Sequence, residues 1–198
     1  MSYVFGPVPS RRLGLSLGVD LIPPKTCTFD CLYCQVGRTL CKTLDEKSYV
    51  PVRDVIVEIK KNLLKSDPDV ITLAGSGEPT LHSEIDQVID SIKEMTDIKV
   101  AVLTNGSLLW RKEVRSRVLM ADIIMPTLSS AIDHTFRRIH RPHGELDLGS
   151  IIDGLKTFSL MRRSCAKTCD AENGLTSRAS RQWRTWWMSK PDDSVRSL

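Results

Sequence analysis

Between residues 15 and 160, short continuous apolar runs alternate with longer stretches whose apolar residues recur at helical spacing. In the stretch 51–65, Val52, Val55, Ile59 and Leu63 recur every three or four residues, as on one face of a helix. Alternating strands and helices indicate right-handed βαβ units around a parallel sheet, so the predicted fold class is α/β with about four such units. The predicted strands are 15–22, 69–74, 99–103 and 122–128, and the predicted helices are 51–65, 83–95, 109–119, 131–139 and 150–160.

Residues 161–198 lose this pattern and contain three of the four tryptophans. So little branched apolar content does not offset the entropy of ordering, and we expect an irregular, disordered tail after a core of residues 1–160. One functional alternative is that Trp183, Trp186 and Trp187 stack on single-stranded nucleic acid. Another is a second cluster site that begins at Cys165 and Cys169. The abrupt change in composition favours an altered reading frame or a truncation over both.

Length and composition indicate one domain with a buried core, since 41% of the 198 residues are apolar. The N-terminus shows no basic or apolar region of a signal peptide, and no apolar run approaches the roughly eighteen residues of a membrane span. We therefore expect no membrane partner. Six cysteines in such a chain indicate reduced thiols and metal ligation, and hence a cytoplasmic protein.

The net charge of +4 is unevenly distributed. Residues 1–155 hold 19 Lys and Arg against 20 Asp and Glu, whereas residues 156–198 hold 9 against 4. The excess positive charge therefore lies in the C-terminal fifth of the chain. The charge balance of residues 1–155 does not indicate a basic patch that would bind nucleic acid.

Cys27, Cys31 and Cys34 form a Cys-x3-Cys-x2-Cys run directly after the first predicted strand. Three thiolates on one tight loop can bind three irons of a [4Fe–4S] cluster, and the fourth iron then stays open to a ligand that is not protein. A structural zinc site that adds Cys41 is an alternative, although paired knuckles a dozen or so residues apart are more usual for zinc. Unliganded thiols are a third interpretation.

Polar or glycine-rich segments also follow the later predicted strands, where the working residues of (β/α) barrels lie. The second strand is followed by the five consecutive residues Gly75, Ser76, Gly77, Glu78 and Pro79. The third is followed by Thr104 and Asn105, and the fourth runs into Ser129. Each of these segments could be a simple turn.

The cysteine run, with the aromatic Tyr33 before its third cysteine and loop 75–79 about forty residues later, resembles the signature of the radical S-adenosylmethionine (radical SAM) superfamily. The sequence segments 5–14 and 135–142 are similar to those of a subgroup of this superfamily that is often placed with wyosine-type tRNA-modifying enzymes. The likeness covers residues 1 to about 158. The family fold is an open barrel of six βα units. Only about four are recognisable in this sequence, so the resemblance implies a partial barrel.

The resemblance also implies the cofactors and their ligands. Cys27, Cys31 and Cys34 would bind a [4Fe–4S] cluster whose open iron is chelated by S-adenosylmethionine. Loop 75–79 would hold the amino group of the methionyl part. Thr104, Asn105 and Ser129 would approach the ribose and the carboxylate, and Tyr33 would lie at the same cofactor site.

The activity implied is reductive cleavage of S-adenosylmethionine to a 5′-deoxyadenosyl radical, which abstracts hydrogen from an unknown substrate, with a tRNA base as one candidate. The electron would come from a partner such as a ferredoxin or a flavodoxin. Two alternatives remain: a radical-activating enzyme that acts on a protein partner, and a truncated cluster-binding remnant without turnover.

Overall fold

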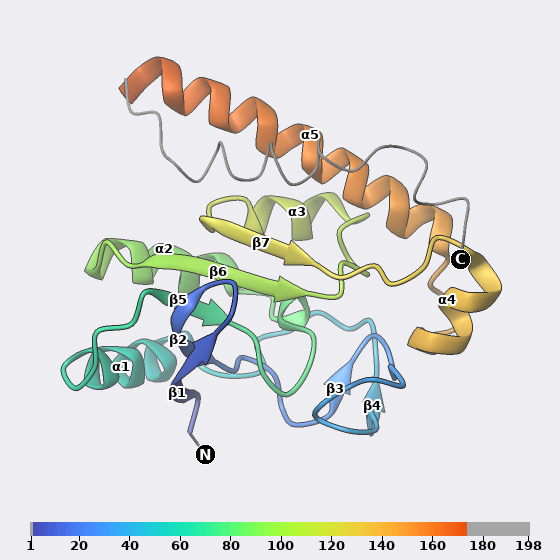
Figure 1. Cartoon of the computed structure of the whole chain (residues 1–198), viewed down its shortest axis with the longest axis horizontal. Helices are drawn as coiled ribbons and strands as arrows, with labels where there is room; N and C mark the ends of the chain where they lie inside the picture. Colours follow the sequence, from blue (N-terminus) through green and yellow to red (C-terminus); the bar gives the residue numbers. More distant parts are fainter. Residues whose placement is uncertain (1, 174–198) are drawn as a thin grey trace. The chain divides into compact units, whose positions relative to one another are not determined.

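The computed structural model describes the backbone of residues 2–173 and the side chains of residues 2–162. The chain divides into a unit that ends at Phe158 and a second unit that begins at Ser159. The first unit holds a five-stranded sheet with the order β1-β2-β5-β6-β7 (Figure 1). Its strands are β1 (Val4–Ser10), β2 (Gly14–Val19), β5 (Val70–Leu73), β6 (Lys99–Thr104) and β7 (Ile123–Pro126).

Strands β2, β5, β6 and β7 are parallel, and each connection between consecutive members of this set contains one α-helix. Because the strand order is sequential and such crossovers are right-handed, the connecting helices cover the same face of the sheet. These helices are α1 (Val52–Leu63), α2 (Ile85–Met95) and α3 (Lys112–Val118). The predicted parallel βαβ order is therefore confirmed, with boundaries that differ by a few residues.

The main core lies between this face and the helices. It includes Leu17, Ile71 and Val102 from the strands, together with Ile59 and Ile89 from the helices, all with 0% exposure. Burying each of these side chains contributes about 1.5–3 kcal/mol. The helical spacing of apolar residues thus reflects one buried stripe on each helix.

Strand β1 was not predicted. It pairs antiparallel with β2 although it contains Pro7 and Pro9, and its register shifts between Phe5 and Val8. Proline is compatible with an edge strand or a bulge, where a missing N–H leaves no ladder hydrogen bond unmade. The phrase at 5–14 therefore forms a strand and the turn that enters β2.

The described strands form an open sheet, with β1 at one end of the strand order and β7 at the other. The parallel α/β class is thus present, and a barrel is not shown. Two short strands outside this sheet, β3 (Thr26–Cys27) and β4 (Cys41–Lys42), pair with each other at the two ends of the cysteine loop.

The last helices are α4 (Asp133–His140) and α5 (Leu148–Asn173). The prediction that regular structure ends near residue 160 was wrong for 161–173, where the backbone stays helical. Neither Gly nor Pro occurs in that stretch, and Met161, Arg162 and Ala166 are good helix formers. The predicted disorder of residues 174–198, the tryptophan alternative and the side chains of Cys165 and Cys169 lie outside the described residues.

Within the part of the backbone that is described, no helix combines the length and the apolar content needed to cross a membrane.

Candidate functional site

The cysteine loop starts after Lys25, beyond the C-terminal end of β2, and its far end returns to the same residue. The Lys25 carbonyl accepts hydrogen bonds from the amides of Leu40 (2.9 Å) and Cys41 (3.0 Å), which close the loop. The Lys25 amide donates to the Ser76 carbonyl at 2.9 Å, which ties the loop to the segment after β5. Figure 1 shows β3 and β4 beyond the arrowheads of the parallel strands. The cysteines therefore lie at the edge where parallel strands present functional loops.

The far side of the loop docks on the C-terminal end of α4. The Leu32 amide donates to the Ile139 carbonyl (2.9 Å), and the Asp30 amide donates to the His140 carbonyl (3.0 Å). Phe29 is buried and packs edge-on against Phe136, with ring centroids 5.6 Å apart. These contacts attach the cysteine loop to α4.

The three thiols of the run have different environments. Cys27 and Cys31 are half-buried, whereas Cys34 is exposed. Desolvation, followed by the negative charge of Glu78, raises the pKa of Cys27 to about 12. Desolvation also raises the pKa of Cys31 to about 11, although a hydrogen bond with Tyr33 acts in the opposite direction. Because metals bind thiolates, any metal or cluster that these cysteines bind would have to displace their protons.

The donor chemistry of the cysteine run suits an iron–sulfur cluster, because soft thiolates are the usual ligands of such clusters. Among the side chains of residues 2–162, no group of three or more His, Cys, Asp or Glu residues converges as ligands of one ion would. A zinc ion needs every sulfur within about 2.3 Å of one point. Thiolates of a [4Fe–4S] cluster each bind a different iron, so they surround a group instead of meeting at a point. The thiol of Cys41, the fourth ligand in the zinc alternative, is exposed.

The glycines of loop 75–79 are required by neighbouring protein atoms. A Cβ on Gly75 would overlap the Asp20 carboxylate, and a Cβ on Gly77 would overlap the Thr26 carbonyl oxygen. The Ser76 amide donates to Asp20 Oδ2 at 2.9 Å. The glycines thus allow this loop to lie directly against the start of the cysteine loop. Pro79 then begins a short 3-10 helix, η1 (Pro79–Leu81).

Glu78 is 2% exposed, and its carboxylate is turned into the protein. Oε1 accepts hydrogen bonds from Thr80 Oγ1 and Thr104 Oγ1, both at 2.6 Å, and Oε2 accepts one from the Asn105 amide at 2.7 Å. Desolvation raises the pKa of Glu78, and these hydrogen bonds act against that shift. The Glu78 carboxylate therefore joins the loop after β5 to the C-terminal end of β6 and the residue that follows it.

Asn105 connects the loop after β6 to the cysteine run. Its side-chain amide donates to Thr28 Oγ1 at 2.8 Å and lies 3.6 Å from Cys27 Sγ. Thr28 in turn shares a hydrogen bond of 2.7 Å with Ser107. The structure therefore brings together Cys27, Glu78, Thr104 and Asn105, which are dispersed in the sequence.

Tyr33 and Ser129 meet at a second point of the site. The Tyr33 hydroxyl lies 3.1 Å from Ser129 Oγ and 3.2 Å from Nδ1 of His140, and that same Nδ1 lies 3.3 Å from Cys31 Sγ. Desolvation lowers the pKa of His140, which favours the neutral imidazole. Sequence reasoning missed His140 because no partner lies at a ligand-like spacing. Its position in the phrase 135–142 was the only signal.

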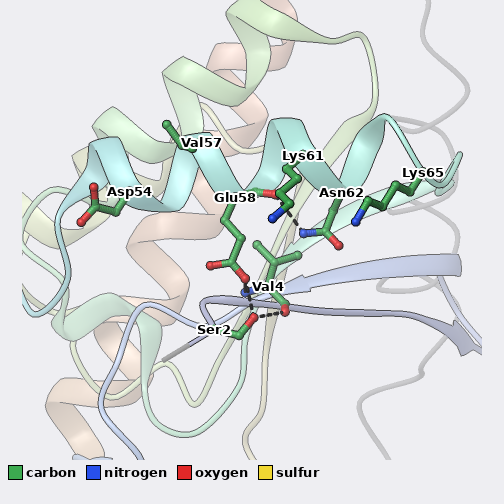
Figure 2. Close-up of a pocket in the computed structure, with 8 residues that line it drawn as sticks. All are labelled: Ser2, Val4, Asp54, Val57, Glu58, Lys61, Asn62 and Lys65. Carbon is green, nitrogen blue, oxygen red and sulfur yellow. Dashed lines mark hydrogen bonds between the residues drawn. The ribbon is translucent and has the colours of Figure 1, made fainter.

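A hollow of about 480 Å³ lies elsewhere, between α1 and the first residues of the chain (Figure 2). The Ser2 hydroxyl and the Glu58 carboxylate line it and are hydrogen-bonded to each other, Lys61 lines it from α1, and Lys65 lines it from just beyond the helix end. None of the predicted site residues lines this hollow, so we do not place the functional site there.

Comparison with known proteins identifies the family. A family model described as the radical SAM superfamily matches residues 21–163. The GTPase Obg of Brachyspira hyodysenteriae is 46% identical over 156 residues, which are 78% of this chain and 23% of that protein. A UPF0026 protein of Methanocaldococcus jannaschii is 38% identical over 161 residues, which are 80% of this chain and 50% of that protein.

A more distant relative is a probable GTP 3′,8-cyclase of Saccharolobus islandicus, 24% identical over 131 residues, or 66% of this chain and 40% of that protein. The chain thus spans half or less of the length of these three relatives. The matched range contains the cysteine run and every predicted loop residue of the site.

Proposed function

This chain belongs to the radical SAM superfamily, and from that premise we propose that it binds a [4Fe–4S] cluster and cleaves S-adenosylmethionine reductively. The observation that carries the proposal is the contact of Asn105 with both halves of the site. Its side chain lies 3.6 Å from Cys27 Sγ, and its backbone amide donates to Glu78 of loop 75–79. The cysteine run, loop 75–79 and Asn105, which were predicted separately from the sequence, are therefore in direct contact.

The thiolates of Cys27, Cys31 and Cys34 would bind three irons and leave the fourth open. When bound, the reduced cluster and S-adenosylmethionine supply a 5′-deoxyadenosyl radical for hydrogen abstraction. We assign recognition of the methionyl amino group to the backbone of loop 75–79. The carboxylate of Glu78 instead holds Thr104 and Asn105 in position beside the cysteine loop.

We further propose a reducing, cytoplasmic setting, an electron donor of the ferredoxin or flavodoxin type, and a tRNA base as the first substrate to test. The distant relative named as a probable GTP 3′,8-cyclase supports a purine-containing substrate class. The subgroup likeness of residues 5–14 and 135–142 supports the choice of tRNA.

The test is 5′-deoxyadenosine formation by the whole chain after anaerobic reconstitution, with dithionite and S-adenosylmethionine and a parallel iron count. We expect product from the wild type and from Cys41→Ser, and none from Cys31→Ala. Iron without product would favour the cluster-binding remnant. Absence of iron after reconstitution would contradict the cluster assignment.

A further inference from the structure

Cys31 has a second layer of contacts that the proposed function does not use. His140 Nδ1 lies 3.3 Å from its sulfur, although the two residues are 109 positions apart in the chain. The imidazole has 0% exposure and packs between Phe136, at 4.9 Å, and Phe29, at 5.2 Å, between ring centroids. These aromatic contacts fix the direction of Nδ1 toward the cysteine.

The other imidazole nitrogen decides which nitrogen carries the proton. The Ser129 backbone amide lies 3.4 Å from His140 Nε2. An amide N–H can only donate, so Nε2 is the acceptor, and the neutral ring then carries its hydrogen on Nδ1. The ring therefore presents a donor to the side where Cys31 lies.

Tyr33 lies at the same point. Its hydroxyl is 3.1 Å from Ser129 Oγ and 3.2 Å from His140 Nδ1. The Nδ1–H of His140 therefore faces two acceptors, the Tyr33 oxygen and, at 3.3 Å, the Cys31 sulfur. An interaction with Tyr33 also acts to lower the pKa of the Cys31 thiol.

We propose that His140 is a positioning residue for the cluster, whose Nδ1–H donates a hydrogen bond to the Cys31 thiolate and raises the reduction potential of the bound cluster. The inference rests on the proposed function, because it requires the cluster. Reduction adds one negative charge to the cluster, and an N–H donor to a ligand sulfur stabilises the more negative state. His140 would therefore ease the reduction that precedes S-adenosylmethionine cleavage.

The test is a redox titration of the reconstituted whole chain, without S-adenosylmethionine, followed by electron paramagnetic resonance. His140→Phe keeps a ring among Phe29 and Phe136 and removes the donor. We expect its reduced-to-oxidised ratio at a given potential to fall about threefold to tenfold, where tenfold corresponds to 59 mV for one electron. His140→Asn returns an amide donor near the Nδ1 position and should restore part of the shift.

The matched control is His134→Phe, which alters an exposed histidine on the same helix and should leave the potential unchanged. Equal potentials in the wild type and His140→Phe, with equal iron, would overturn the inference while the proposed function stands. An equal shift in His134→Phe would overturn it as well. If His140→Phe holds no iron, His140→Leu, which also removes the donor, decides, and a wild-type potential in that variant would reject the inference. Failure of the wild type to hold iron would refute the proposed function itself.

Discussion

At the scale of single residues, Glu78 stabilises the protein through hydrogen bonds with neighbouring residues. Its carboxylate accepts hydrogen bonds from Thr80, Thr104 and Asn105 inside the protein. We predict that Glu78→Gln lowers the free energy of unfolding by about 2–3 kcal/mol, because the new NH₂ group faces a donor and leaves it unpaired. Urea unfolding followed by circular dichroism measures this.

Glu94→Gln, at an exposed position of α2, is the matched control and should change the stability by less than about 0.5 kcal/mol. Equal stability of Glu78→Gln and the wild type would contradict the internal role of this carboxylate.

Glu58 predicts a pH dependence of stability. Desolvation raises its pKa, but hydrogen bonds from the Ser2 hydroxyl and the amides of Tyr3 and Val4 outweigh that effect and lower the pKa below its ordinary value of 4.5. Figure 2 shows Ser2 and Val4 beside the Glu58 carboxylate. A lowered pKa means that the stabilisation is present above the unfolded-state pKa and is lost as the pH falls through the folded-state pKa.

Glu58→Gln should therefore cost about 1 kcal/mol at pH 7 and flatten the stability curve below pH 4.5, since the carboxylate is partly exposed. Thermal unfolding of both proteins between about pH 3 and pH 7, the range over which carboxyl groups titrate, measures the difference. Parallel curves for the two proteins would reject the role of Glu58.

At the scale of elements, the close contact between loop 75–79 and the cysteine loop depends on one glycine. A Cβ at Gly77 would overlap the Thr26 carbonyl oxygen and would lie 2.6 Å from Ile22 Cγ2. We predict that Gly77→Ala separates the loops, lowers stability by about 1–3 kcal/mol and lowers iron loading. Thermal unfolding and an iron assay after reconstitution measure the two effects.

Gly144→Ala is the control, because nothing lies within 4 Å of a Cβ at that position. It should keep wild-type iron loading. A Gly77→Ala protein with the stability and the iron content of the wild type would show that the loops need no such close approach.

Elements with one buried stripe or a continuous apolar run were predictable. Helix α2 buries Ile85, Val88, Ile89 and Ile92, which are the residues that define its helical spacing. Strand β1 was missed because its prolines disfavour a strand except at an edge, and edge position is a property of the sheet. Strands β3 and β4 are two residues each, too short for any periodicity.

At the scale of the whole molecule, the iron stoichiometry separates the metal sites considered. A three-cysteine cluster predicts about four irons per chain, and Cys41→Ser should keep that number. Cys41 is exposed, and its amide hydrogen bond to Lys25 does not use the thiol. Loss of metal in Cys41→Ser, with zinc present in the wild type, would favour the four-cysteine alternative. Metal analysis by mass spectrometry measures both.

By itself the sequence determined the family and the parallel βαβ order, because periodicity and motif spacing are local properties of the chain. It also placed Glu78, Thr104 and Asn105 at or just beyond the C-terminal ends of their strands. Only the tertiary structure decided that the Glu78 carboxylate faces inward, that Asn105 lies beside Cys27, and that His140 lies beside Cys31. These contacts join residues far apart in the chain, and their partners depend on how the loops pack against one another at the sheet edge.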